Sequence, residues 1–169
     1  TVKAFDPVYL DTSDYIDTAV LDTFVVAATT FYDPLEREIR VDTAKGFFTQ
    51  TVYTPWEIAH YDSDDTVKDS PYYKANINNP ELNPFEKKAL QQAALFYDTP
   101  STEVLDNFNR TVQKRDINTL DGTDPQTYIN DFVLDIQGNV LQSADARLVE
   151  SNIYNFTNAY SLTGELLNV

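Results

Sequence analysis

Asp135-Ile-Gln-Gly138-Asn-Val-Leu141 and Ser161-Leu-Thr-Gly164-Glu-Leu-Leu167 are two copies of one short pattern. Each copy places apolar residues on both sides of a glycine-centred reversal, which is typical of a strand, a tight turn and a second strand. Gly138 and Gly164 supply the positive φ that such a turn requires. The sequence therefore predicts two Gly-turn hairpins in the C-terminal part of the chain.

A second pattern occurs three times upstream, as Asp33-Pro34-Leu-Glu36, Thr54-Pro55-Trp-Glu57 and Asn83-Pro84-Phe-Glu86. An Asp, Thr or Asn side chain accepts a hydrogen bond from a free amide of a helix's first turn. Proline at the first helical position loses no hydrogen bond, and glutamate at the third reaches back to the cap. Each copy therefore predicts the beginning of a helix.

Apolar residues at steps of three and four extend this helical prediction along most of the upstream chain. We predict helices over about 14–32, 34–45, 55–60, 84–97 and 101–115, a strand over 47–53 and a long loop over 61–82. For 14–32 the many β-branched residues leave a pair of strands as the alternative. The chain then has an extended lead-in, 1–13, and one domain, 14–169. The predicted fold is α+β, with a mainly helical N-terminal two-thirds packed on a small antiparallel C-terminal sheet of two Gly-turn hairpins.

Composition narrows the function classes. The chain has 169 residues, of which 42% are hydrophobic, and its net charge is −15. A surface with this charge repels nucleic acid and anionic membranes. There is no cysteine, so disulfides and thiolate metal sites are excluded. No apolar run reaches the length of a transmembrane helix. We expect protein partners, and neither nucleic acid nor a membrane span.

Catalytic motifs are sparse. His60 is the only histidine, and Glu57-Ile-Ala-His60 has the spacing that puts both side chains on one face of a helix. Carboxylate-bridged di-iron bundles use that spacing twice, whereas it occurs once here. The sequence also lacks the glycine-rich phosphate-binding motifs and the nucleophile elbow. A hydrolase that uses acidic residues, with or without His60, remains one alternative.

Asp135, Gln137 and Asn139, followed by Asp145, give a candidate metal site. This segment resembles one half of a dockerin-type calcium loop, in which acidic or amide ligands alternate. It departs from that pattern by the Gln at the third position and by a loop one residue shorter. The resemblance implies calcium as the only candidate cofactor.

The same segment, 132–141, is also similar to the hairpin of extracytoplasmic PAS-like sensor domains. That resemblance implies a ligand-binding sensor-like domain as a second alternative.

The predicted long loop, 61–82, holds Tyr61, Tyr72 and Tyr73 among several aspartates. Tyrosine is favoured at interfaces because its large ring carries a polar tip. Loops of this length are functional or packed on a neighbour. These three tyrosines are therefore the predicted partner-binding residues. We predict a non-enzymatic structural or assembly protein that forms a homo- or hetero-oligomer in a virion, an appendage or an extracellular surface.

Overall fold

The computed structural model describes residues 1–7, 9, 14–22, 25–120 and 122–168, and strands dominate it. The elements are β1 (Val2–Phe5), α1 (Thr18–Leu21), β2 (Ala27–Tyr32), β3 (Glu38–Asp42), β4 (Phe48–Tyr53), β5 (Glu57–Tyr61), η1 (Val67–Asp69), α2 (Pro71–Asn76), α3 (Pro84–Ala93), η2 (Ala94–Phe96), β6 (Ser101–Leu105), β7 (Thr111–Asn118), β8 (Gln126–Leu134), β9 (Val140–Ala144), η3 (Val149–Ser151), β10 (Phe156–Thr157), β11 (Ala159–Tyr160) and β12 (Leu166–Asn168).

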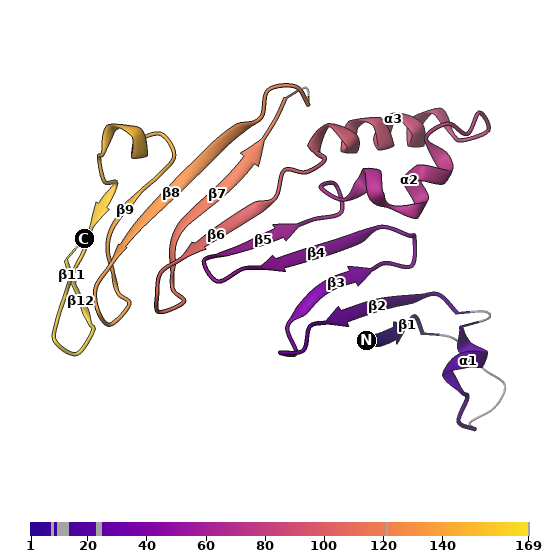
Figure 1. Cartoon of the computed structure of the whole chain (residues 1–169), viewed down its shortest axis with the longest axis horizontal. Helices are drawn as coiled ribbons and strands as arrows, with labels where there is room; N and C mark the ends of the chain where they lie inside the picture. The colour runs from indigo at the N-terminus through magenta and orange to yellow at the C-terminus, as the bar shows by residue number, and fades with distance from the viewer. Residues whose placement is uncertain (8, 10–13, 23–24, 121, 169) are drawn as a thin grey trace. The chain divides into compact units, whose positions relative to one another are not determined.

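Strands β1 to β10 follow their sequence order along a ten-stranded antiparallel sheet, and β11 with β12 forms a separate two-stranded one. Short turns join most successive strands, so the topology is a meander (Figure 1). The described residues form only three short α-helices. The predicted α+β fold with a mainly helical N-terminal two-thirds is therefore wrong.

By their internal contacts the residues divide into two compact units. The first comprises 1–51 and 62–97, and the second comprises 52–61 and 98–169. The prediction of one domain over 14–169 stays a prediction. Residues 8 and 10–13 of the predicted N-terminal lead-in lie outside the described residues, whereas Val2–Phe5 form β1.

The first unit packs α2 and α3 beside a β1–β4 sheet. In the register, Lys3 lies opposite Thr29, which in turn lies opposite Asp42. Among the described residues of this unit, the buried apolar side chains are Phe48, Val67 and Leu90. Phe48 lies on β4, whereas Val67 and Leu90 lie in segment 62–97. The core of this unit therefore depends on that segment.

The second unit is built on β6, β7, β8 and β9, which pair in sequence order. Leu105 and Ala144 are its buried apolar residues among those described. Polar side chains are paired across the strands. Arg115 reaches Glu57 at 3.1 Å, and Gln113 donates to Asp131 at 2.6 Å. The sheet therefore carries mixed polar and apolar surfaces.

Two of the three predicted helix starts are turns between strands. Asp33 does accept a hydrogen bond from the amide of Leu35, as an N-cap would, but Glu36 then adopts φ 61° and the chain reverses. The first step of such a turn is the same as that of a helix cap, and the following residues decide between them. The alternating Glu38-Ile-Arg-Val sequence favours a strand.

The third predicted start is correct. Asn83 caps α3, its side chain accepts from the amide of Phe85, and Pro84 is the first helical residue. The residues that follow, Lys87-Lys-Ala-Leu90, are strong helix formers. The strand predicted over 47–53 is confirmed as β4.

The other predicted helices are wrong. Among its described residues, segment 14–32 forms the four-residue α1 and then β2, which agrees with strand formation by the β-branched residues at 29–30. Segment 34–45 contains β3, 55–60 contains β5, and 101–115 contains β6, a turn and the start of β7. The predicted loop, 61–82, contains η1 and α2.

Candidate functional site

One hydrogen-bonded turn recurs at the strand ends. In three copies an aspartate begins the turn, and one of its carboxylate oxygens accepts from the amides two and four residues later. The distances are 2.8 and 3.0 Å from Asp33, 2.9 and 2.9 Å from Asp106, and 2.8 and 2.9 Å from Asp135. The fourth residue has positive φ in each copy. The geometry is that of a hairpin turn with a left-handed residue.

Two further turns use a hydroxyl in place of the carboxylate. Ser161 accepts from the amides of Thr163 and Glu165, and Thr43 accepts from the amide of Phe47. The left-handed positions are Gly164 and Gly46. The predicted reversals at Gly138 and Gly164 are therefore confirmed. Segments 33–37 and 106–110 form related turns but contain no glycine, so the glycine pattern in the sequence did not reveal them.

The aspartate turns also pair with the side chain at their last position. Arg37 donates to Asp33 at 2.7 Å and Arg110 to Asp106 at 2.8 Å, while Asn139 donates to Asp135 at 2.8 Å. The hydrogen bond from Arg110 lowers the pKa of Asp106. An Asp with Arg or Asn four residues later is the sequence signal that these three turns share.

Arg110 also connects two neighbouring turns of the second unit. It donates to the carbonyl oxygens of Asp135 at 2.7 Å and Ile136 at 3.4 Å. A Cβ atom added to Gly138 would lie 3.7 Å from the Cδ atom of Arg110. Hairpins β6–β7 and β8–β9 are therefore joined at their turns as well as along their strands.

The candidate calcium residues separate into two groups. Asp135, Gln137 and Asn139 lie in one turn, where the Asp135 oxygens accept the turn's own hydrogen bonds. Asp145 follows β9 and pairs with Arg147 and Asn155. The five residues of β9, roughly 17 Å of strand, lie between them. No group of three or more His, Asp or Glu side chains is arranged to hold a metal ion among the described residues. Calcium binding stays a prediction.

Glu57 and His60 lie on strand β5 and not on a helix. Side chains three residues apart point to opposite faces of a strand. The Glu-x-x-His spacing therefore does not bring these two groups together.

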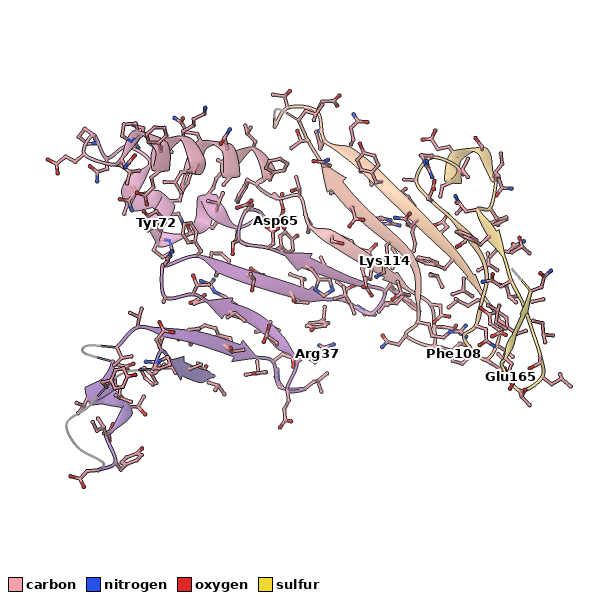
Figure 2. The ribbon with its side chains drawn as sticks, turned by 180° about the vertical axis from the view of Figure 1, so that it is seen from behind. Arg37, Asp65, Tyr72, Phe108, Lys114 and Glu165 are labelled. Atoms are coloured by element: carbon pink, nitrogen blue, oxygen red, sulfur yellow. The ribbon has the colours of Figure 1, made fainter. Side chains whose placement is uncertain are left out.

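The predicted partner-binding tyrosines also separate. Tyr61 ends β5 in the second unit, whereas Tyr72 and Tyr73 lie on α2 in the first. The Tyr72 ring packs on Phe47 with centroids 5.1 Å apart, and its hydroxyl donates to Glu86. Figure 2 shows Tyr72 at α2, beside the turn between β3 and β4.

A groove of about 710 Å³ lies beside Tyr72. It is lined by Lys45, Phe47, Asp64, Val67, Tyr72, Glu86, Ala89, Leu90, Gln92, Ala93 and Phe96. These residues come from the β3–β4 turn, the segment before α2, α2 itself, α3 and η2. The groove is mainly apolar.

Comparison with solved structures finds similarity along nearly the whole chain. The crystal structure of TcdB2-TccC3-TEV matches 98% of it at 31% identity and a TM-score of 0.78. This chain resembles a stretch of a Tc toxin complex. The structure of the Photorhabdus luminescens Tc holotoxin pore with mutated TccC3 matches 98% of the chain at 30% identity and a TM-score of 0.78. The crystal structure of TcdB2-TccC3-Cdc42 matches 84% of the chain at 33% identity and a TM-score of 0.69.

The similarity covers a small part of those proteins, since the chain spans 6–7% of the chains it matches. No protein-family model and no curated protein matches the sequence. Among the described residues no helix is long and apolar enough to cross a membrane.

Proposed function

We propose that this chain is a structural segment of a Tc-type toxin complex, where it contributes antiparallel sheet and makes protein–protein contacts. The observation that carries the proposal is the similarity to Tc complex chains over 98% of the sequence at 30–31% identity. Because the chain spans 7% of those chains, the proposed role is that of one segment within a larger assembly.

The exposed surface supports an assembly role. Several large apolar side chains are strongly exposed, such as Leu162 at 99%, Leu120 at 96% and Ile136 at 82%. Where such side chains lie together, they mark contact with other protein surfaces.

The repeated turns support the same role. Each hairpin is a similar supersecondary unit that contacts its sequence neighbours, which is how repeat architectures extend. At the ends of the strand order, β1 pairs with β2 and β10 pairs with β9. The outer edges of such strands are templates for further strand pairing. In a secreted toxin complex these contacts would form outside the cell.

Native mass measurement together with hydrogen exchange tests the proposal. We expect the intact protein to purify in a stoichiometric complex with another protein chain. Within that complex, the backbone amides of 153–168 should exchange more slowly than in the isolated 169-residue chain. A protein recovered without partners, with equal exchange in both forms, would contradict the proposed role.

A further inference from the structure

Four turns of the second unit lie at the same end of its strands. One leads into β5, one joins β6 to β7, one joins β8 to β9, and one joins β11 to β12; they are 54–57, 106–110, 135–139 and 161–165. Successive strands pair antiparallel, so every second turn of the meander comes to the same end. Figure 2 shows Phe108 and Glu165 at this end of the unit.

Each of these turns exposes one large apolar side chain. The exposed fractions are 58% for Trp56, 62% for Phe108, 82% for Ile136 and 99% for Leu162. Phe108 keeps this exposure although the Arg110 guanidinium lies 5.3 Å from the centre of its ring. Because neighbouring strands are about 4.8 Å apart and one turn serves two strands, the four side chains recur roughly every 10 Å. We call these four side chains the turn row.

Hydrogen bonds between neighbouring turns hold the turn row in place. The amide of Leu105 donates to the carbonyl of Trp56 at 2.8 Å, which fixes the first turn beside the end of β6. Arg110 binds two carbonyls of the third turn, as described above. The amide of Asn158 donates to the carbonyl of Leu141 at 2.8 Å, so the segment that leads into the last turn lies beside β9. A pre-ordered row lowers the ordering cost of a contact.

Charge is distributed unevenly along the turn row. Arg115 and Arg110 lie at the first two turns, in ion pairs with acids of those turns at 3.1 and 2.7 Å. The last two turns carry Asp135 and Glu165, and within the described part of the chain neither forms an ion pair with a basic side chain. A second row running in the opposite direction would therefore bring arginine of each chain to the acids of the other.

The exposed area is sufficient for a specific contact between two such rows. At roughly 150–250 Å² for each large side chain, the exposed fractions leave roughly 450–750 Å² of apolar surface on one chain. Two rows face to face would bury about twice that area, and a specific interface needs roughly 1,000 Å² in total. The area therefore supports a dimer at the weak end of specific association.

We propose that the turn row binds the turn row of a second copy of this chain, with the two rows antiparallel and related by a two-fold axis. The axis lies between the second and third turns, so Phe108 of each chain contacts Ile136 of the other, and Trp56 contacts Leu162. The contact is isologous, and the spacing of the two rows matches because they are identical. It uses the second unit alone and goes beyond the role proposed above, which names no second copy.

Sedimentation velocity of the intact protein at increasing concentration measures this contact. We expect a reversible monomer–dimer equilibrium, with a dissociation constant at least about ten-fold higher for Ile136→Ser and for Leu162→Ser. Leu120→Ser serves as the matched control, because it removes a 96% exposed leucine that follows the opposite end of β7. A monomer at all concentrations, or equal weakening by Leu120→Ser, would overturn the proposal.

Salt gives the dimer a second signature. Two chains of net charge −15 repel each other at long range, and salt screens that repulsion. The dimer should therefore be tighter at about 150 mM than at about 10 mM sodium chloride. Weakening by salt would overturn an association carried by the apolar row. If Ile136→Ser instead weakens only a contact with a different chain, the second copy is the wrong occupant, while the role proposed above stands.

Cross-linking tests the antiparallel arrangement. The chain has no cysteine, so an introduced cysteine is a unique label. Pro55→Cys and Thr163→Cys place it at exposed positions of the first and last turns and keep all four apolar side chains. A bis-maleimide that spans about 10 Å should join the two variants when they are mixed, but not Thr163→Cys to itself, because about three turn spacings, roughly 30 Å, separate the two copies. Equal cross-linking in both samples would overturn the proposal.

Discussion

Single carboxylates at the hairpin turns do more than supply negative charge. Asp106 holds two backbone amides and the Arg110 guanidinium at once, and Arg110 in turn binds the carbonyl of Asp135 in the next turn. Charge-assisted hydrogen bonds of this kind are stronger than neutral ones. Each such residue therefore links a local reversal to its neighbour in the sheet.

Replacing Asp106 tests that link. Asp106→Ala removes the acceptor for both amides and the partner of Arg110, so the melting temperature should fall. Asp106→Asn keeps a side-chain oxygen but loses the charge, and should lower it less. Thermal unfolding followed by circular dichroism measures both variants. Glu81→Ala, an exposed acid on the α2–α3 loop, serves as the control, and an equal effect of all three substitutions would contradict the role of Asp106.

Acid should weaken the same network. Hydrogen bonds from Arg110, Asn139 and Arg147 lower the pKa values of Asp106, Asp135 and Asp145 below the ordinary 3.8, in the last case to about 2. Depressed pKa values contribute stability that is complete above the ordinary pKa and is lost as the pH falls through the folded value. Melting temperatures should therefore drop between about pH 4 and about pH 2. Asp145→Asn should show a shallower drop, and an identical drop would argue against this carboxylate.

The hairpin is the element that the chain repeats, and its left-handed residue controls the reversal. That position holds Glu36, Asn109, Gly138 or Gly164 with φ between 61° and 96°. Asparagine is evidently accepted there, whereas β-branched residues disfavour positive φ. The turn therefore requires a residue that tolerates positive φ, and glycine is not the only residue that meets this condition.

Two substitutions at Gly138 separate this steric condition from a need for glycine itself. Gly138→Val should cost about 1–3 kcal/mol of unfolding free energy, because the residue has φ 96°. Gly138→Asn should cost less than about 1 kcal/mol, since asparagine tolerates this region. Denaturant unfolding measures both. Equal costs would mean that contact with Arg110, and not backbone conformation, limits this position.

At the scale of the whole molecule, charge and uncovered surface dominate. The chain has twenty-seven acidic residues and twelve basic ones. The observed ion pairs include short contacts such as that of Lys3 with Asp22 at 2.6 Å, but exposed pairs contribute little. Net repulsion should therefore outweigh their attraction in the isolated chain.

Salt should accordingly stabilise the isolated chain. Raising sodium chloride from about 10 mM to about 150 mM shortens the screening length to roughly 8 Å, which weakens the long-range repulsion more than the close pairs. We expect the melting temperature to rise. The same series with sucrose in place of salt controls for solute exclusion, and a fall with salt would show that the ion pairs dominate.

The sequence by itself determined the local features that a few adjacent residues decide. Gly138 and Gly164 fix reversals because they accept positive φ, and Asn83 with Pro84 begins α3 because good helix formers follow. The sequence also determined the net charge of −15. The sequence did not decide between a helix and a turn at Asp33. An aspartate that accepts a hydrogen bond from the amide two residues later is found at the start of a helix and at the start of a turn alike.

Only the tertiary structure decided the ten-stranded order and the groove. Strand pairing is non-local, so a segment such as 101–115 with apolar residues at helical spacing becomes two strands once β7 pairs with β8. The groove brings together the β3–β4 turn that holds Phe47, residues 64–72, and the helical segment of α3 and η2, which are far apart in sequence. Their meeting depends on the packing of Tyr72 against Phe47 and Glu86, which no local pattern encodes.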